Sequence, residues 1–139
     1  MLESTSENKE IESHNRKVDR IKKRLVDLDL PVLPLNCVKS PFYVPDIITR
    51  VDKNFIVIDF INTKERVPFD VGGLCLIYNK DIVDSVLAII DDGLWKRHEK
   101  GFQRVRMNLP PKMHVLPEKE VEEYFKSRTE ATMLWKVKS

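Results

Sequence analysis

The sequence predicts an α+β fold in which an N-terminal helix leads through a proline-rich connector into a small β-rich domain followed by a C-terminal helix. Three observations predict it. Apolar residues recur at three- and four-residue spacing within residues 1–30, prolines concentrate within 31–42, and strand-length apolar runs separated by polar turns follow from residue 43. With 139 residues, 42% of them hydrophobic, the chain is large enough for one domain with its own core.

The first element, residues 1–30, is expected to be an amphipathic helix that ends at Pro31 and Pro34. Its apolar stripe is narrow, as in a coiled-coil seam, and His14 fills the one gap in it. An isolated helix of this length is marginal in water, so it must pack on its own domain, on a second copy or on a partner helix. We favour an intermolecular helix pair. Its expected interface residues are Ile11, Val18, Ile21, Leu25 and Leu28.

The connector, residues 31–42, holds three prolines and is expected to be stiff and extended. The domain that follows, residues 43–116, is predicted to be a β-meander or an OB-like, partly open barrel with one core helix. Its expected elements are strands at 43–51, 55–61, 65–71 and 74–78, a helix at 82–90, and strands at 102–107 and 112–116. Residues 117–139 are expected to form a helix and an apolar docking tail around Trp135.

A heptad helix that leads through prolines into a small barrel resembles the N-terminal region of proteasomal ATPase subunits. The residues that carry this likeness are Tyr43-Val44 and 47–53, although Pro45 stands where that family has glycine. A helix that leads into a small β domain is also similar to the dimerisation region of the DP family of transcription-factor partners, on residues 56–59 and Asp81-Ile82. Both resemblances imply a layout used for assembly rather than for chemistry.

Catalysis, cofactors and metals are not expected from the motifs. The chain has no glycine-rich nucleotide-binding motif, no Cys-x-x-Cys and no His-Glu-x-x-His. Its histidines at 14, 98 and 114 share no local ligand spacing. The acidic pairs Asp91-Asp92 and Glu122-Glu123 are expected to be solvated surface.

Positive charge is concentrated in the last third of the chain, since residues 95–139 carry 11 basic and 6 acidic side chains. If 102–107 is a strand, Arg104 and Arg106 share one face with Phe102, as in surfaces that follow a phosphate backbone. A solvated basic edge and an acidic protein partner are the other interpretations. The surface residues predicted for nucleic acid or for an acidic partner are Arg97, Lys100, Phe102, Arg104 and Arg106.

An intracellular location, cytoplasmic or nuclear, is expected because residues 1–10 are polar and unlike a secretory signal, and no apolar run is long enough to span a membrane. Cys37 and Cys75 are expected to be reduced, buried thiols. Together these patterns predict a non-catalytic assembly or adaptor subunit that binds a protein partner or itself through its N-terminal helix and apolar tail. The alternative is an OB-like nucleic-acid-binding module that uses residues 95–106.

Overall fold

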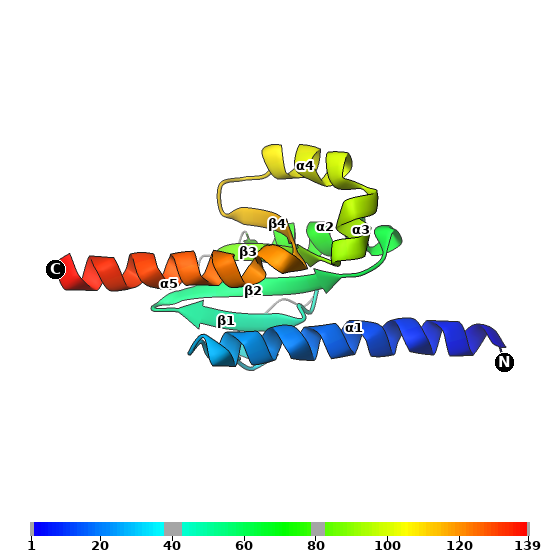
Figure 1. Cartoon of the computed structure of the whole chain (residues 1–139), viewed down its shortest axis with the longest axis horizontal. Coiled ribbons are helices and arrows are strands. Elements are labelled where there is room, and N and C mark those ends of the chain that lie inside the picture. The colour runs from blue at the N-terminus through cyan, green and yellow to red at the C-terminus, as the bar shows by residue number, and fades with distance from the viewer. Residues whose placement is uncertain (1, 38–42, 79–82, 139) are drawn as a thin grey trace.

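The computed structural model describes the backbone of residues 2–37, 43–78 and 83–138, and the side chains of residues 12–37, 43–78 and 83–129. Over these residues the chain is a mixed α and β protein with four strands and five α-helices (Figure 1). The elements in order are α1 (Leu2–Asp27), β1 (Ile47–Val51), β2 (Asn54–Ile61), α2 (Val67–Tyr78), β3 (Val83–Ile90), α3 (Asp92–Arg97), α4 (Glu99–Met107), β4 (Met113–Pro117) and α5 (Val121–Lys138).

The four strands form one open sheet in the order β1-β2-β3-β4. A tight turn joins β1 to β2, which pair antiparallel, with Asp52 in the left-handed conformation at φ 57°. The pairs β2–β3 and β3–β4 are parallel. Parallel neighbours need long crossover connections, and α2 and the α3–α4 pair provide them.

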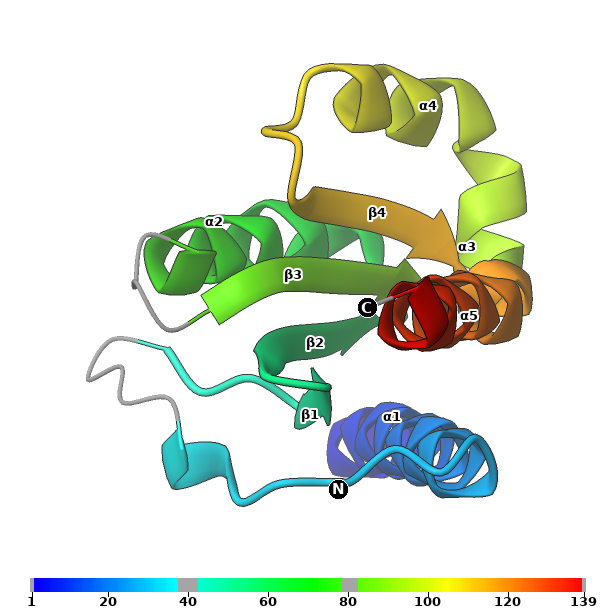
Figure 2. The same cartoon turned by 90° about the vertical axis from the view of Figure 1, so that its left-hand side faces the viewer.

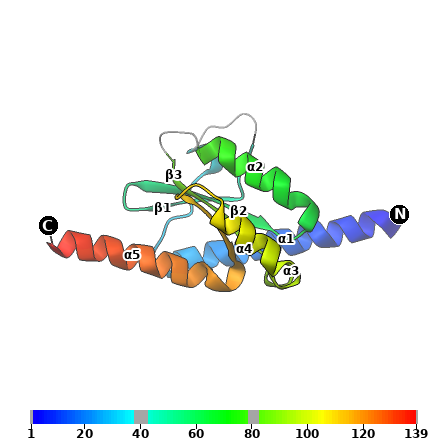
Figure 3. The same cartoon turned by 90° about the horizontal axis from the view of Figure 1, so that it is seen from above.

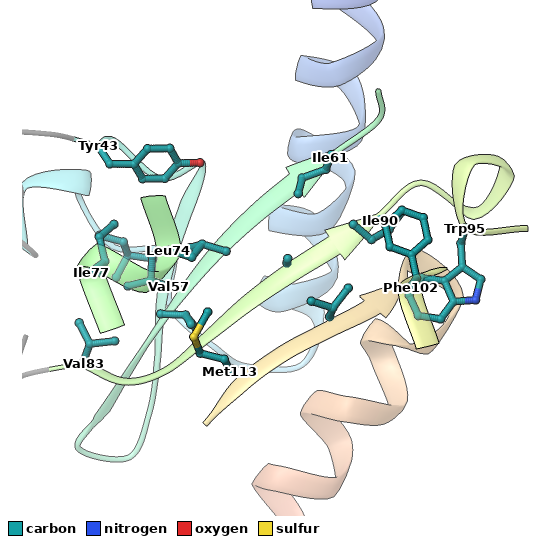
Figure 4. Packing of buried hydrophobic residues seen from close by; sticks show 14 of the residues in the cluster. Tyr43, Val57, Ile61, Leu74, Ile77, Val83, Ile90, Trp95, Phe102 and Met113 are labelled. Atoms are coloured by element: carbon teal, nitrogen blue, oxygen red, sulfur yellow. The ribbon is translucent and has the colours of Figure 1, made fainter. Parts of the chain in front are cut away.

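The sheet is the middle of three layers. Helices α2, α3 and α4 cover one face, whereas α1 and α5 cover the other (Figure 2). Each face has its own apolar core. The first extends from Tyr43 and Leu74 to the stacked rings of Trp95 and Phe102 (Figure 4), and the second joins Ile21 and Leu25 of α1 to the sheet and α5.

This topology overturns the expected meander or partly open barrel, and one expected helix is a strand. Residues 83–90, within the predicted helix at 82–90, form β3. The continuous apolar run 86–90 fits a buried strand as well as a helix, because a parallel strand between two helical layers is covered on both faces.

Two expected strands, 65–71 and 74–78, are replaced by α2. The buried residues of α2 are Asp70, Gly73, Leu74 and Ile77, which recur at helical spacing once Asp70 is counted as an inward-facing residue. The alternation of apolar and polar residues over 65–71 predicts a strand in which Asp70 lies on the opposite face from Val67 and Phe69. Pro68 does not break α2, because it occupies the first turn, where its missing N–H has no partner to lose.

The expected strand at 102–107 is also a helix, α4. The other predicted elements hold: α1 lies within 1–30, β1 and β2 match the first two strands, β4 matches 112–116 and α5 lies within 117–139. The connector 31–42 is described only as far as residue 37. Asp81 and Ile82, which carried one of the resemblances, lie outside the described residues.

Candidate functional site

The apolar stripe of α1 faces the sheet of its own chain. Val18, Ile21 and Leu25 are buried, with Ile21 and Leu25 at 0% exposure, and Leu28 packs partly against the same cluster. The side chain of Ile11 lies outside the described residues. A partner helix cannot reach Val18, Ile21 or Leu25 while α1 holds this position. In this part of the stripe the helix therefore packs on its own domain rather than on a partner helix.

Polar contacts at three successive turns also fix α1, each at the C-terminal end of a different strand. His14 Nε2 lies 3.0 Å from the Phe60 carbonyl oxygen in β2 and 3.2 Å from Asp46 Oδ2. Lys17 pairs with Asp91, directly after β3. Arg20 Nε donates to Glu118 Oε1 at 2.9 Å, directly after β4. His14, which fills the gap in the apolar stripe of α1, therefore contacts residues of its own chain.

Both terminal helices continue past the sheet, in opposite directions. The N-terminal part of α1 extends beyond one end of the molecule and the C-terminal part of α5 beyond the other, in both Figure 1 and Figure 3. The backbone of Trp135 lies in this part of α5, and its side chain is outside the described residues.

The predicted basic surface at 97–106 is divided by the helical geometry of α4. Phe102 is buried and stacks on Trp95, with ring centroids 5.2 Å apart and an interplanar angle of 6° (Figure 4). The Arg106 guanidinium lies 4.8 Å from the Trp95 ring centroid, and Arg106 Nε donates to the Val115 carbonyl at 2.9 Å. The expectation that Phe102, Arg104 and Arg106 share one exposed face is therefore wrong.

Three of the predicted basic residues, Arg97, Lys100 and Arg104, remain exposed. In the helix, Phe102 and Arg106 are one turn apart and both face Trp95, whereas Arg104 lies on the opposite side of α4. The exposed cations of this segment therefore have no accessible aromatic ring from Trp95 or Phe102 beside them.

A polar cavity of about 530 Å³ lies where α1, the segment before β1, the end of β2 and α2 meet. Its lining includes the titratable residues His14, Tyr43, Asp46, Asp59 and Asp70. Asp59 and Asp70 are almost fully buried, at 2% and 5% exposure. Buried carboxylates are costly unless they accept hydrogen bonds, so their partners decide what the cavity can do.

A continuous hydrogen-bond network joins these carboxylates. The backbone N–H of Asp46 donates to Asp59 Oδ1 at 2.9 Å, and the Phe60 N–H donates to Asp46 Oδ2 at 2.9 Å. The Tyr43 hydroxyl contacts both Asp59 and Asp70, the latter at 2.9 Å. Because a phenol has one hydrogen, only one of the two carboxylates can accept it at a time.

Protonation of Asp59 supplies the second hydrogen that Tyr43, Asp59 and Asp70 need to form two hydrogen bonds. Burial raises the pKa of Asp59 to about 7, with the nearby carboxylates of Asp46 and Asp70 adding to it and the hydrogen bonds from Tyr43 and the Asp46 N–H opposing it. A protonated Asp59 can donate to the Tyr43 oxygen while Tyr43 donates to Asp70. Burial also raises the pKa of Tyr43, so the phenol stays protonated. Asp59 therefore exchanges its proton near neutral pH.

The cavity depends on the close approach of Tyr43 to α2. A Cβ at Gly73 would overlap the Tyr43 ring, so no other residue type fits there without displacing the phenol. In the sequence, Gly73 is the second residue of the pair Gly72-Gly73, which matches no ligand-binding motif. This second glycine is what lets Tyr43 reach both carboxylates.

A second partly buried histidine, His114, lies in the edge strand β4 and contacts α5. His114 in β4 has Nε2 3.3 Å from Arg128 Nη2, and Arg128 Nη1 lies 3.6 Å from Asp84 Oδ2. Burial lowers the pKa of His114, and the positive charges of Arg128 and Arg106 lower it further. His14 behaves oppositely: its hydrogen bond to Asp46 raises its pKa to about 9 against the effect of burial.

The cavity residues come from positions 14 to 70 and form no local motif, which is why the sequence analysis missed them. One signal was available. Asp59 interrupts the apolar run 55–61 of the strand Asn54–Ile61, whose residues from Ile56 onward are all buried. A carboxylate inside a strand covered on both faces needs buried partners, and this position indicates a polar network.

Over the described residues, no group of three or more His, Cys, Asp or Glu side chains is arranged to hold a metal ion. The described helices include none that combines the length and the apolar character needed to cross a bilayer. Both cysteines are free. Cys37 is exposed, contrary to the expectation of a buried thiol, and Cys75 is partly buried.

The fold defines a class, a three-layer protein built on an open, mixed four-stranded sheet with helices on both faces. No protein-family model, curated protein or solved structure matches this chain.

Proposed function

We propose that the protein is a non-catalytic assembly or adaptor subunit that contacts a protein partner, a second copy or a different chain, through the projecting ends of its terminal helices. The observation that carries this is that α1 and α5 both continue past the sheet (Figures 1 and 3). A helix beyond the layer on which it packs has no core of its own to bury its apolar residues.

The C-terminal end is the stronger of the two contacts. Helix α5 packs on the sheet through Val121 and Phe125 and continues to Lys138. Its last turns contain apolar residues, among them Leu134 and Trp135. Tryptophan is among the residues most enriched at the energetic centres of protein interfaces. We therefore assign Trp135 to the partner contact.

The contribution of α1 is confined to its projecting part. Val18, Ile21 and Leu25 hold α1 on the sheet, and Leu28 packs beside them. Among the five residues predicted to form a helix pair, we therefore propose only Ile11 as a contact with a partner. The free thiols of Cys37 and Cys75 support the proposal of an intracellular, reducing environment.

Light scattering over a range of protein concentrations tests self-assembly. We expect Trp135→Asp to reduce the molar mass of an oligomeric wild type, whereas Ser127→Asp, an exposed change earlier on α5, leaves it unchanged. Leu25→Asp should unfold the chain rather than dissociate it, because Leu25 is buried in the core. A wild type that stays at the mass of one chain excludes self-assembly.

Photo-crosslinking in cells tests a different partner. A photoreactive residue at position 135 should form a crosslinked protein complex, and the same residue at position 127 should not. Absence of a crosslink from both position 135 and position 11 would contradict the proposed function.

Nucleic-acid binding by residues 95–106 is the second candidate. It is favoured by the exposure of Arg97, Lys100 and Arg104, none of which has a carboxylate partner among the described residues. It predicts that a single-stranded oligonucleotide binds with steep salt dependence, because bound phosphates release counterions. Charge reversal at Arg104 should then abolish binding without changing the oligomeric state.

A further inference from the structure

A groove lies between the start of α2 and the α3–α4 pair. These helices cover the sheet face opposite α1 and α5 (Figure 2). Its volume is about 780 Å³. Val67 and Pro68 of α2 line one wall, and Phe102 and Val105 of α4 line the other. Pro68 is exposed, while Val67 and Val105 are partly exposed, so the groove presents apolar surface to solvent.

Positive charge surrounds this apolar lining. Lys64, Lys96, Arg97 and Lys100 all line the groove and are all exposed. The ion pairs among the described residues include none of these four. The single carboxylate among the lining residues is Glu99. The groove therefore combines apolar walls with an excess of unpaired cations, and a complementary ligand must be both apolar and anionic.

The state of the aromatic rings decides between two classes of anionic ligand. Nucleobases bind by stacking on exposed aromatic faces. In this groove Phe102 is buried, at 5% exposure, and its ring already stacks on Trp95. The aliphatic lining residues with accessible side chains are Val67, Pro68 and Val105. These side chains suit an aliphatic side chain better than a base.

We propose that this groove binds an acidic protein segment that places one or two aliphatic side chains between its carboxylates. The aliphatic side chains would enter the groove between α2 and α4, and the carboxylates would pair with the surrounding lysines and Arg97. This surface does not depend on the helix ends proposed above as the assembly contacts, since α1 and α5 lie on the other face of the sheet.

Gly101 offers a way to block the groove without changing its charge. It lines the groove, and a Cβ built on it meets no atom within 4 Å. Gly101→Leu should fill the space between the walls and also favour the helix, because glycine is a poor helix former. Gly72 provides the matched control. It is an exposed glycine in α2 that also has nothing within 4 Å and does not line the groove.

The probe is a fluorescent synthetic peptide of glutamates that flank a central Leu-Leu pair, and binding is measured by fluorescence anisotropy. We expect Gly101→Leu to weaken binding by about tenfold or more, with Gly72→Leu unchanged. The double variant Lys64→Glu and Lys100→Glu should weaken binding by a similar factor. Lys53→Glu with Lys119→Glu makes the same charge change at exposed residues outside the groove and should have little effect.

Two further probes make the proposal falsifiable. A peptide with Ser-Ser in place of Leu-Leu should bind more weakly, and equal binding would overturn the proposal by showing attraction of charge alone. A single-stranded oligonucleotide that binds through Lys64 and Lys100, while the Leu-Leu peptide does not bind, would assign the groove to nucleic acid and overturn it. Absence of binding by the Leu-Leu peptide to folded wild type would also overturn it. Thermal unfolding of each variant checks that it is folded.

Discussion

Two partly buried histidines, His14 of α1 and His114 of β4, have pKa values shifted in opposite directions. His14 lies beside the acid-rich cavity, and its hydrogen bond to Asp46 raises its pKa to about 9. His114 lies beside Arg128 and Arg106, where burial and these positive charges lower its pKa. Burial acts in the same direction on both rings. The difference shows that a carboxylate neighbour reverses the effect of burial at His14, whereas at His114 burial is the larger cause and the neighbouring cations add to it.

The two environments should respond to opposite changes of pH. Around the cavity, both His14 and Asp59 hold a proton in the folded chain at pH values where the unfolded chain has released it. Around His114 the folded chain releases its proton before the unfolded chain does. The acid-rich side is therefore weakened by raising the pH, and the cation-rich side by lowering it.

The largest effect should come from disrupting the cavity through Gly73. Gly73→Ala forces the Tyr43 ring away from Asp59 and Asp70, and we expect the free energy of unfolding to fall by about 3 kcal/mol. Urea denaturation measures it. The control is Gly72→Ala in the same helix, which should raise stability by up to about 1 kcal/mol because its Cβ meets open space. Equal effects of the two variants would show that Tyr43 does not need the close approach.

The second effect is expected from the protonation of Asp59. Its pKa is raised from 3.8 to about 7, so wild-type stability should fall as the pH rises between these values. Asp59→Asn keeps the shape of the protonated acid and can donate to Tyr43. We expect it to remove this dependence and to raise the free energy of unfolding by about 2 kcal/mol at pH 8. Urea denaturation of both proteins across this pH range is the measurement, and parallel curves would contradict the assignment.

The third effect concerns His14. Because its folded pKa is raised, its contribution to stability is fully present below pH 6.5 and is lost as the pH rises through about 9. An NMR titration should find a high pKa for the His14 ring. Asp46→Asn removes the main cause of the shift, so the pKa should move toward the ordinary value. An unchanged pKa in that variant would show that Asp46 is not the cause.

The smallest effect should come from Arg128→Gln, which removes one of the positive charges near His114. The same NMR titration should find the pKa of His114 higher than in wild type and still below 6.5, because burial is the larger cause. A value at or above 6.5 would show that charge rather than burial controls this ring.

The sequence correctly predicted those elements whose apolar pattern alone distinguishes a helix from a strand. The helix within 1–30 has a clear apolar period, and the hairpin of β1 and β2 has two apolar runs around a polar turn. The run at 86–90 was wrongly assigned to a helix, because its strand form depends on being covered by α2 and the α3–α4 pair on one face and by α1 and α5 on the other. Residues 65–71 alternate apolar and polar side chains as a strand does. They nevertheless lie largely in α2, which forms the crossover between the parallel strands β2 and β3, and such crossovers are usually helical.

The binding surfaces could be predicted only in part. Arg97, Lys100 and Arg104 were recognised from composition and are exposed. Phe102 and Arg106 were grouped with them because a two-residue period aligns 102, 104 and 106, whereas the helical period separates 104 from the other two. The cavity was missed because residues as far apart as His14 and Asp70 meet only after the sheet has formed.

The polar contacts of α1 affect how the chain folds while it is being synthesised. Lys17 and Arg20 emerge early from the ribosome, but their partners Asp91 and Glu118 follow 74 and 98 residues later. Until β4 is made, the stripe of Val18, Ile21 and Leu25 has no complete surface to pack on. Contacts of such long range slow folding, and an uncovered apolar helix is prone to aggregation in the meantime. During synthesis the apolar stripe of α1 therefore stays uncovered until the strands and helix on which it packs have followed it.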